Sequence, residues 1–251
     1  MTMACSRMIL ILSLLGGVAT PVIAQAAASS VARFEFSVMA TERMRDVGFA
    51  QLKPEMGSKP RPVAADYEII PLRISSQGRS DLYTYEGPLP LRIVETAPAA
   101  EGEAPRAVRM LGAFSRTTVP PRALLLLAPS PTKEGDLAVT LLDDSAAGFP
   151  SRHMRVVNLS GVTVAGSLGG IEFTTTEAKP ILAAQRVESS VSVGVAYERR
   201  GVPTVVFDQS IRVGESERVM LVFLPPFRPG ADVRVRVVRD SVGSMAVDAE
   251  D

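Results

Sequence analysis

The chain is poor in the residue types on which most metal and thiol chemistry depends. Its 251 residues include one cysteine, one histidine and no tryptophan. A zinc site needs several cysteine or histidine ligands, so His153, between Arg152 and Arg155, is expected to be an ordinary exposed histidine at the start of a strand. The lack of tryptophan argues against a sugar-binding face, where flat aromatic rings are usual.

Helical patterns and an excess of charge are also missing. No segment keeps the apolar spacing of an amphipathic helix, which argues against parallel α/β folds and the nucleotide-binding loops that they carry. The glycine-rich residues 166–170 lack the lysine of a phosphate-binding loop, and we expect a hairpin turn there. The 27 basic and 27 acidic side chains balance, so no nucleic-acid partner is expected.

The N-terminus has the pattern of a secretory signal peptide. Arg7 precedes an apolar run over residues 8–18, and small residues lead to an expected cleavage after Ala24. The run is shorter than the roughly 20 residues of a membrane span; an uncleaved N-terminal anchor is the alternative. Cys5 precedes the run, so we expect no lipid attachment and no disulfide in the mature chain. The prediction is an exported chain, periplasmic or extracellular, with no membrane span in its mature part.

One stretch of the sequence occurs twice. Residues 119–144 and residues 215–240 align without a gap at an offset of 96 positions. Each copy consists of an apolar run, a proline-rich turn, a run of alternating apolar residues and an acidic end. This pattern predicts two strands joined by a loop, and the offset matches the size of one small β-domain.

The predicted fold is therefore all-β, with two tandem immunoglobulin-like (Greek-key) β-sandwich domains after the signal peptide. The signal peptide covers residues 1–24, the domains cover residues 31–145 and 150–240, and residues 241–251 form a disordered tail. One large sandwich in place of two domains is the alternative.

Local patterns add further predictions within this frame. Residues 41–47 are expected to form a helical turn, and residues 49–65, which are rich in proline, a loop. A strand is expected over residues 178–182. Pro71 cannot donate a ladder hydrogen bond, so the strand around it belongs at the edge of a sheet or is interrupted there.

Acidic and edge-strand residues are the remaining candidates for function. Asp143 with Asp144, or Asp232 with Asp240, could contribute to a calcium site, but the acids are few and lack the spacing of a calcium loop. The run at residues 233–237 alternates valine and arginine, which either protects a sheet edge or offers a template for strand addition. We predict no catalytic, cofactor-binding or metal-binding residue and no cofactor.

Several short motifs in the second half resemble a set of uncharacterised exported proteins of bacteria such as the Verrucomicrobia. They are Phe149-Pro150 after an acidic pair, the residues RVVNLS at 155–160, and the glycine turn at 168–170. The resemblance covers about residues 65–240 and implies a secreted β-sandwich with no known activity. The tandem arrangement is also similar to periplasmic pilus chaperones, although the Arg–Lys pair of their cleft is not found.

These observations predict an exported, non-enzymatic β-sandwich protein of the bacterial envelope that acts by protein–protein or surface interaction. Its partner is expected to be a protein or an envelope component, with no nucleic acid involved. Two alternatives remain: a periplasmic chaperone or adaptor that completes the sheet of a partner by strand addition, and a carbohydrate-active or carbohydrate-binding accessory protein. The last would need two suitably spaced carboxylates from distant strands.

Overall fold

A computed structural model describes residues 31–44, 46–53, 56, 63–74, 78–97, 104–115, 118–130, 133–176, 182, 185–228 and 230–241. Its first eight strands are β1 (Val31–Ala40), β2 (Val47–Leu52), β3 (Tyr67–Pro71), β4 (Tyr83–Pro88), β5 (Leu91–Ala97), β6 (Arg106–Phe114), β7 (Arg122–Pro129) and β8 (Leu137–Asp143). The next eight are β9 (His153–Asn158), β10 (Val164–Leu168), β11 (Ile171–Thr175), β12 (Gln185–Arg186), β13 (Ser190–Arg199), β14 (Val202–Arg212), β15 (Glu217–Leu224) and β16 (Arg234–Ser241).

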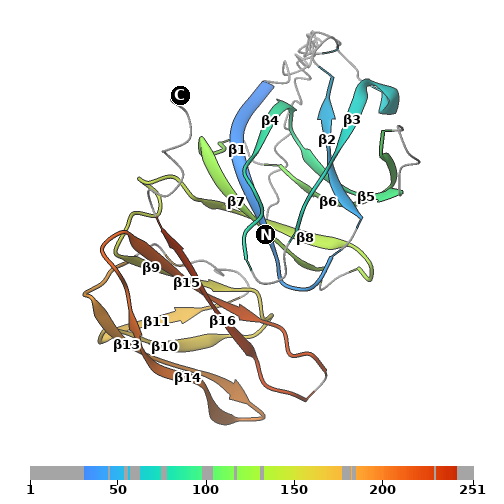
Figure 1. Cartoon of the computed structure of the whole chain (residues 1–251). Helices are drawn as coiled ribbons and strands as arrows, with labels where there is room; N and C mark the ends of the chain where they lie inside the picture. Colours follow the sequence, from blue (N-terminus) through green and yellow to red (C-terminus); the bar gives the residue numbers. More distant parts are fainter. Residues whose placement is uncertain are drawn as a thin grey trace, which may run out of the picture.

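The fold is all-β, as predicted. A short 3-10 turn, η2 (Ala64–Asp66), precedes β3, and no α-helix is present in the part of the chain that the structure describes. Strands β1–β8 form one half of the molecule and strands β9–β16 the other, and the two halves lie against each other (Figure 1). We call them the first half and the second half.

The two halves share one strand order. The first half contains the sheets β4-β1-β7-β8 and β3-β2-β5-β6, and the second half contains β12-β9-β15-β16 and β11-β10-β13-β14. Adding eight to each strand number of the first half gives the second. The one parallel pair of each half also corresponds, because β1 runs parallel to β7 and β9 runs parallel to β15. The copies of the sequence repeat therefore occupy equivalent positions, β7–β8 and β15–β16.

Each half encloses an apolar core between its two sheets. In the first half, Phe36 and Phe49 from opposite sheets meet edge to face with their ring centroids 5.2 Å apart. In the second half, Val193 of one sheet and Leu221 of the other belong to one cluster of buried side chains. This packing is that of a sandwich, in which the alternating side chains of two sheets fill the space between them.

Two local predictions near the N-terminus are wrong. No helical turn is present at the described residues 41–44 and 46–47: the Thr41 N–H donates to the Leu127 carbonyl at 2.9 Å, extending the β1–β7 ladder, and Val47 already begins β2. The chain crosses here from one sheet to the other, which leaves no room for a helix. The predicted loop over residues 49–65 begins too early, because Phe49 is fully buried within β2.

Other predictions agree with the structure or fall outside it. Strand β3 ends at Pro71 and lies at the edge of its sheet, as expected. Of the strand predicted over residues 178–182, only Leu182 lies within the described residues, and it is not in a strand. The predicted signal peptide lies outside the described residues. So does the predicted tail apart from Ser241, which belongs to β16.

Candidate interaction surface

The two copies of the repeat pack against each other and form a third apolar core between the halves. Leu124 and Leu126 of β7 face this core, and so do Met220 and Val222 of β15, which follow them by 96 positions. Equivalent sides of equivalent strands therefore meet, as in a two-fold symmetric interface. The other buried members of this core are Met39, Leu142, Phe149, Val157, Leu224 and Val238.

Each copy of the repeat also supplies one arginine and one aspartate to an ionic cluster beside this core. Arg122 and Asp144 of the first copy correspond to Arg218 and Asp240 of the second. The Arg218 guanidinium donates to Asp144 Oδ2 at 3.1 Å and to Asp240 Oδ2 at 2.6 Å. Arg79 adds a 2.6 Å bond to Asp144. The Arg218 and Asp144 side chains are 4% and 2% exposed, so the ion pair that joins the halves is buried.

Phe149, in the segment that links the halves, makes cation–π contacts with two arginines. Its ring centroid lies 4.5 Å from the Arg155 guanidinium carbon and 5.1 Å from that of Arg218. Arg155 also donates to the carbonyls of Asp143 and Gly148. Burial lowers the pKa of Arg155, an effect that Asp144 and Asp143 oppose. These contacts fix the linking segment against both halves.

The acids considered for calcium are held by donors of the protein itself. Asp143 accepts from the Ser145 N–H and hydroxyl, and Asp232 accepts from Tyr197 and Arg199. Asp144 and Asp240 are occupied by the arginines of the ionic cluster. Within the described ranges, no three acidic, histidine or cysteine side chains are grouped as metal ligands. All four acids therefore have structural roles as hydrogen-bond or ion-pair partners.

His153, Asn158 and the glycine-rich stretch at residues 166–170 are explained by local structure as well. His153 begins β9, as predicted, but it is half-buried and its Nδ1 lies 2.8 Å from the Ser151 carbonyl. Asn158 donates to the Val162 carbonyl at 2.7 Å and so closes the turn before β10. The glycine-rich stretch is the turn between β10 and β11, with Gly169 and Gly170 at positive φ.

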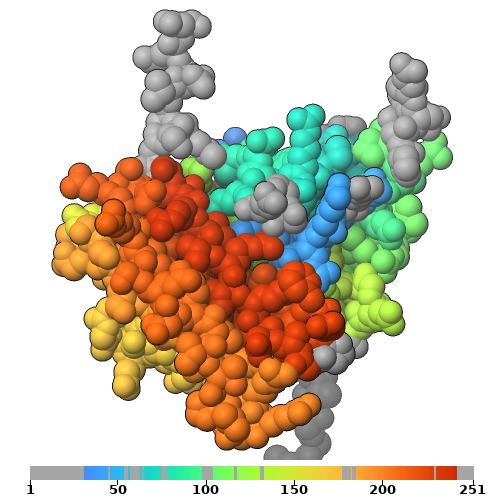
Figure 2. All heavy atoms as spheres, turned by 60° about the horizontal axis from the view of Figure 1, so that its bottom comes forward, coloured from blue at the N-terminus to red at the C-terminus, as the bar shows by residue number. Residues whose placement is uncertain are grey.

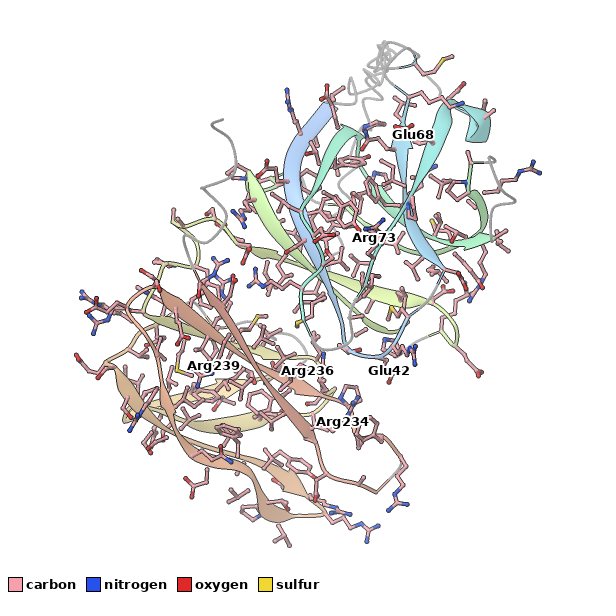
Figure 3. The ribbon with its side chains drawn as sticks, in the orientation of Figure 1. Glu42, Glu68, Arg73, Arg234, Arg236 and Arg239 are labelled. Carbon is pink, nitrogen blue, oxygen red and sulfur yellow. The ribbon has the colours of Figure 1, made fainter. Side chains whose placement is uncertain are left out.

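The alternating valine–arginine run of β16 points its arginines at the first half. Arg236 donates to the Ala40 carbonyl at 3.0 Å and to the Thr41 carbonyl at 3.3 Å. Burial lowers the pKa of Arg236, and the neighbouring Arg234 lowers it further. Figure 3 labels both arginines together with Glu42, which lies 3.9 Å from Arg234. This arrangement favours protection of the β16 edge over its use as a template.

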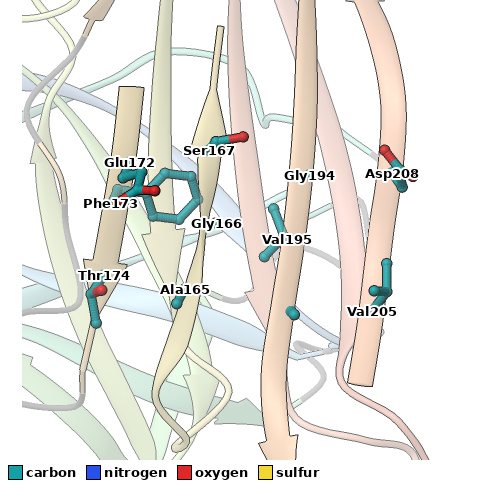
Figure 4. A pocket seen from close by; sticks show the side chains of 11 residues that line it. Ala165, Gly166, Ser167, Glu172, Phe173, Thr174, Gly194, Val195, Val205 and Asp208 are labelled. Atoms are coloured by element: carbon teal, nitrogen blue, oxygen red, sulfur yellow. The ribbon is translucent and has the colours of Figure 1, made fainter. Parts of the chain in front are cut away.

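A trough lies on the outer face of the sheet β11-β10-β13-β14. Its volume is about 560 Å³. Small residues on the two central strands form its floor, and Glu172, Thr174, Val205 and Asp208 on the outer strands form its rims (Figure 4). The small floor residues are Ala165, Ser167, Gly194 and Ala196. The result is a shallow, open channel along the central strands with an acidic residue on each side.

The two carboxylates of the trough lie on strands that are widely separated for glycoside hydrolysis. Glu172 lies on β11 and Asp208 on β14, three strand positions away in the same sheet. Neighbouring strands are about 4.8 Å apart, so roughly 14 Å separates these two strands. Glycosidases place their two carboxyl groups about 5–9.5 Å apart. The trough is therefore better suited to binding than to this chemistry.

Strand β14, which forms one rim of the trough, is a long and exposed edge strand. It has 11 residues and is hydrogen-bonded to β13 on one side, while its other side is the edge of the sheet. Val205 is 67% exposed on it. In Figure 2 the orange residues of β13 and β14 stand at the surface of the second half, at the lower edge of the view. An edge of this kind presents backbone hydrogen-bond donors and acceptors with which another polypeptide chain can pair.

The equivalent edge strand of the first half is exposed over its first five residues and covered toward its C-terminal end. Strand β6 packs beside β8, and a side chain at Gly112 would come within 2.6 Å of the Leu137 carbonyl oxygen. Arg109 of β6 further bonds Glu95 at 2.6 Å and lies 3.7 Å from Asp136. β14 has a looser counterpart of this closure. Arg239 of β16 donates to the carbonyl of Arg212, the last residue of β14, and also to Glu217 of β15.

Sequence reasoning did not find the trough or the β14 edge. The signal for the trough was available, because small residues at alternate positions of two adjacent strands predict a depressed sheet face. No signal in the sequence indicated the exposure of β14. The repeat predicts β15 and β16 but does not indicate which strand lies at the edge of a sheet. Tertiary pairing alone decides that question.

Known proteins offer no direct guide to this surface. No protein-family model matches the chain, and no curated protein matches it either. A helix long and apolar enough to cross a membrane does not occur in the part of the chain that the structure describes.

Proposed function

We propose that this chain is an exported, non-catalytic binding protein of the bacterial envelope that captures an extended segment of a protein partner by strand addition at β14. The observation that carries the proposal is the long edge strand beside the trough. The apolar run at residues 8–18 supports export. The two halves with one shared strand order support the assignment of two tandem immunoglobulin-like domains.

The affinity of such a contact comes from the backbone. An added strand pairs its N–H and C=O groups with the open edge, and its alternate side chains settle on either face of the extended sheet. At β14 one face is the trough side, where Asp208 stands at the rim. A lysine or arginine of the partner on that face would complement Asp208, so we expect the captured segment to alternate apolar residues with a basic one.

The role of the first half follows from the contact between the halves. The buried Arg218–Asp144 pair and the cation–π contacts of Phe149 hold the two halves together, so the binding half is presented in one orientation. This arrangement suits an adaptor, in which one domain binds while the other sets its position. The contact between the halves does not require a catalytic residue in either of them.

Photocrosslinking in the exporting host tests the proposal. A photoreactive residue replaces Val205 in one variant and Val108 in a matched control, since both valines are exposed on equivalent edge strands, at 67% and 62%. We expect a discrete crosslinked protein with the probe at position 205 and none with the probe at 108. Equal adducts at both positions, or a chain recovered only as a free monomer from both variants, would contradict strand addition at β14.

A further inference from the structure

A second contact surface lies where β14 begins. The β15–β16 loop carries Phe227, which at 82% exposure is the most exposed of the large apolar side chains that the structure describes. The β13–β14 turn beside it carries Arg200 and leads into Val202, which is 61% exposed. With the exposed Arg228, these residues form a surface that we call the basic tip: Arg199, Arg200, Val202, Phe227 and Arg228.

Phe227 contacts an arginine that is itself hydrogen-bonded within the same loop. The Arg234 guanidinium carbon lies 3.8 Å from the centre of its ring, and Arg234 Nε donates to the Pro225 carbonyl at 2.6 Å. Arg199 then ties this loop to the β13–β14 turn, because it donates to the Gly230 carbonyl and to Asp232. An aromatic ring fixed in place loses little conformational entropy on binding, which is what makes such residues effective anchors of interfaces.

The charges of the basic tip determine which side chains of a partner would complement it. Asp232 is paired with Arg199 at 2.8 Å, and Glu198 is the other exposed acid of the turn. Arg200 and Arg228 are both exposed beside the apolar Phe227 and Val202. An apolar side chain next to an acidic one would match this combination. The charge along the binding edge thus changes from acidic at Asp208 to basic at its first residues.

We infer that the basic tip is the specificity end of the β14 site, binding an apolar and an acidic side chain at one end of the captured segment. This inference rests on the proposed strand addition. It implies that the partner segment has a fixed register, since its basic residue must lie at Asp208 while its apolar–acidic end lies at Phe227 and Arg228. Backbone pairing alone would leave register undefined.

Selection from a displayed library of random 12-residue peptides tests the inference with a defined probe. The baits are the full chain, the double variant Phe227→Ser with Arg228→Glu, the edge variant Val205→Lys, and a control, Lys133→Glu, in the corresponding loop of the first half. We expect peptides selected on the full chain to alternate apolar residues around a basic one and to end in an apolar–acidic pair. Their affinity for the double variant should fall about tenfold or more, as for loss of an interface anchor, while Lys133→Glu binds them unchanged.

The outcomes separate the two proposals. If selection on the double variant still enriches the alternating peptides but without the apolar–acidic end, the tip is confirmed as the specificity end. If the enriched ends are the same with both baits, or if the affinity changes less than twofold, the tip inference is overturned and strand addition stands. If Val205→Lys binds the selected peptides as well as the full chain does, strand addition fails and the tip inference fails with it.

Discussion

The two halves of this molecule share a strand order and differ in what they leave open. In the first half, β6 packs beside β8, and Gly112 allows the two backbones to approach closely. In the second half, the equivalent β14 remains a long edge strand beside a trough and the basic tip. The stability of the two halves does not by itself require their equivalent edge strands to be covered to different extents. The proposed strand addition at β14 rests on this difference.

The ionic cluster shows a second departure from symmetry. Arg122 and Arg218 are equivalent, yet the Arg122 side chain is 36% exposed and lies 3.9 Å from Asp144, whereas Arg218 is buried and bonds both aspartates. The two equivalent arginines therefore hold different positions: Arg218 lies at the centre of the cluster and Arg122 at its edge. The central pair, Arg218 with Asp144, joins the halves, and the outer members complete the cluster.

The largest expected effect is that of Asp144→Asn. This change removes the buried carboxylate that Arg79 and Arg218 share, while Arg218 keeps its pair with Asp240. Breaking a buried ion pair costs about 3–5 kcal/mol of unfolding free energy. The matched variant Asp240→Asn removes the equivalent, more exposed carboxylate while Asp144 still holds Arg218, so its loss should be less than half as large. Urea unfolding of both variants measures this difference. Equal losses would show that the two copies contribute symmetrically and would remove the distinction drawn between them.

A smaller effect concerns the tyrosines of the two halves. Tyr85 in the first half is fully buried and donates to the Pro88 carbonyl at 2.6 Å, and burial raises its pKa to about 12. Tyr197 in the second half also has a raised pKa, caused by burial and then by its hydrogen bond to Asp232. The unfolded chain loses the Tyr85 proton near pH 10 while the folded chain keeps it. The stability contributed below pH 10 is therefore lost between about pH 10 and 12.

Unfolding free energies of the wild type and Tyr85→Phe across that pH range measure this loss. The phenylalanine cannot ionise, so the decline with pH should be shallower in the variant. An identical decline in both chains would mean that Tyr85 is not held protonated by the core of the first half.

The sequence carried more information about architecture than about function, for physical reasons. The alternating residues of each repeat copy sufficed to predict β7–β8 and β15–β16, because strand periodicity is a local property. Phe49 was assigned to a loop because nearby prolines outweighed a short buried strand. The pairing of Arg218 with Asp144 and Asp240 joins residues 74 and 22 positions apart, and no local pattern encodes it. The exposed edge of β14 likewise depends on pairing between distant strands.

Hydrogen exchange of β14 in the complex tests the central claim most directly. With the crosslinked partner identified and bound to the full chain, strand addition requires the outward-facing amides of β14 to form new ladder hydrogen bonds. We predict slowed exchange at alternate amides along Val202–Arg212 and unchanged exchange along β6. Unchanged exchange along β14 in a saturated complex would contradict the account, because the partner would then bind without extending the sheet.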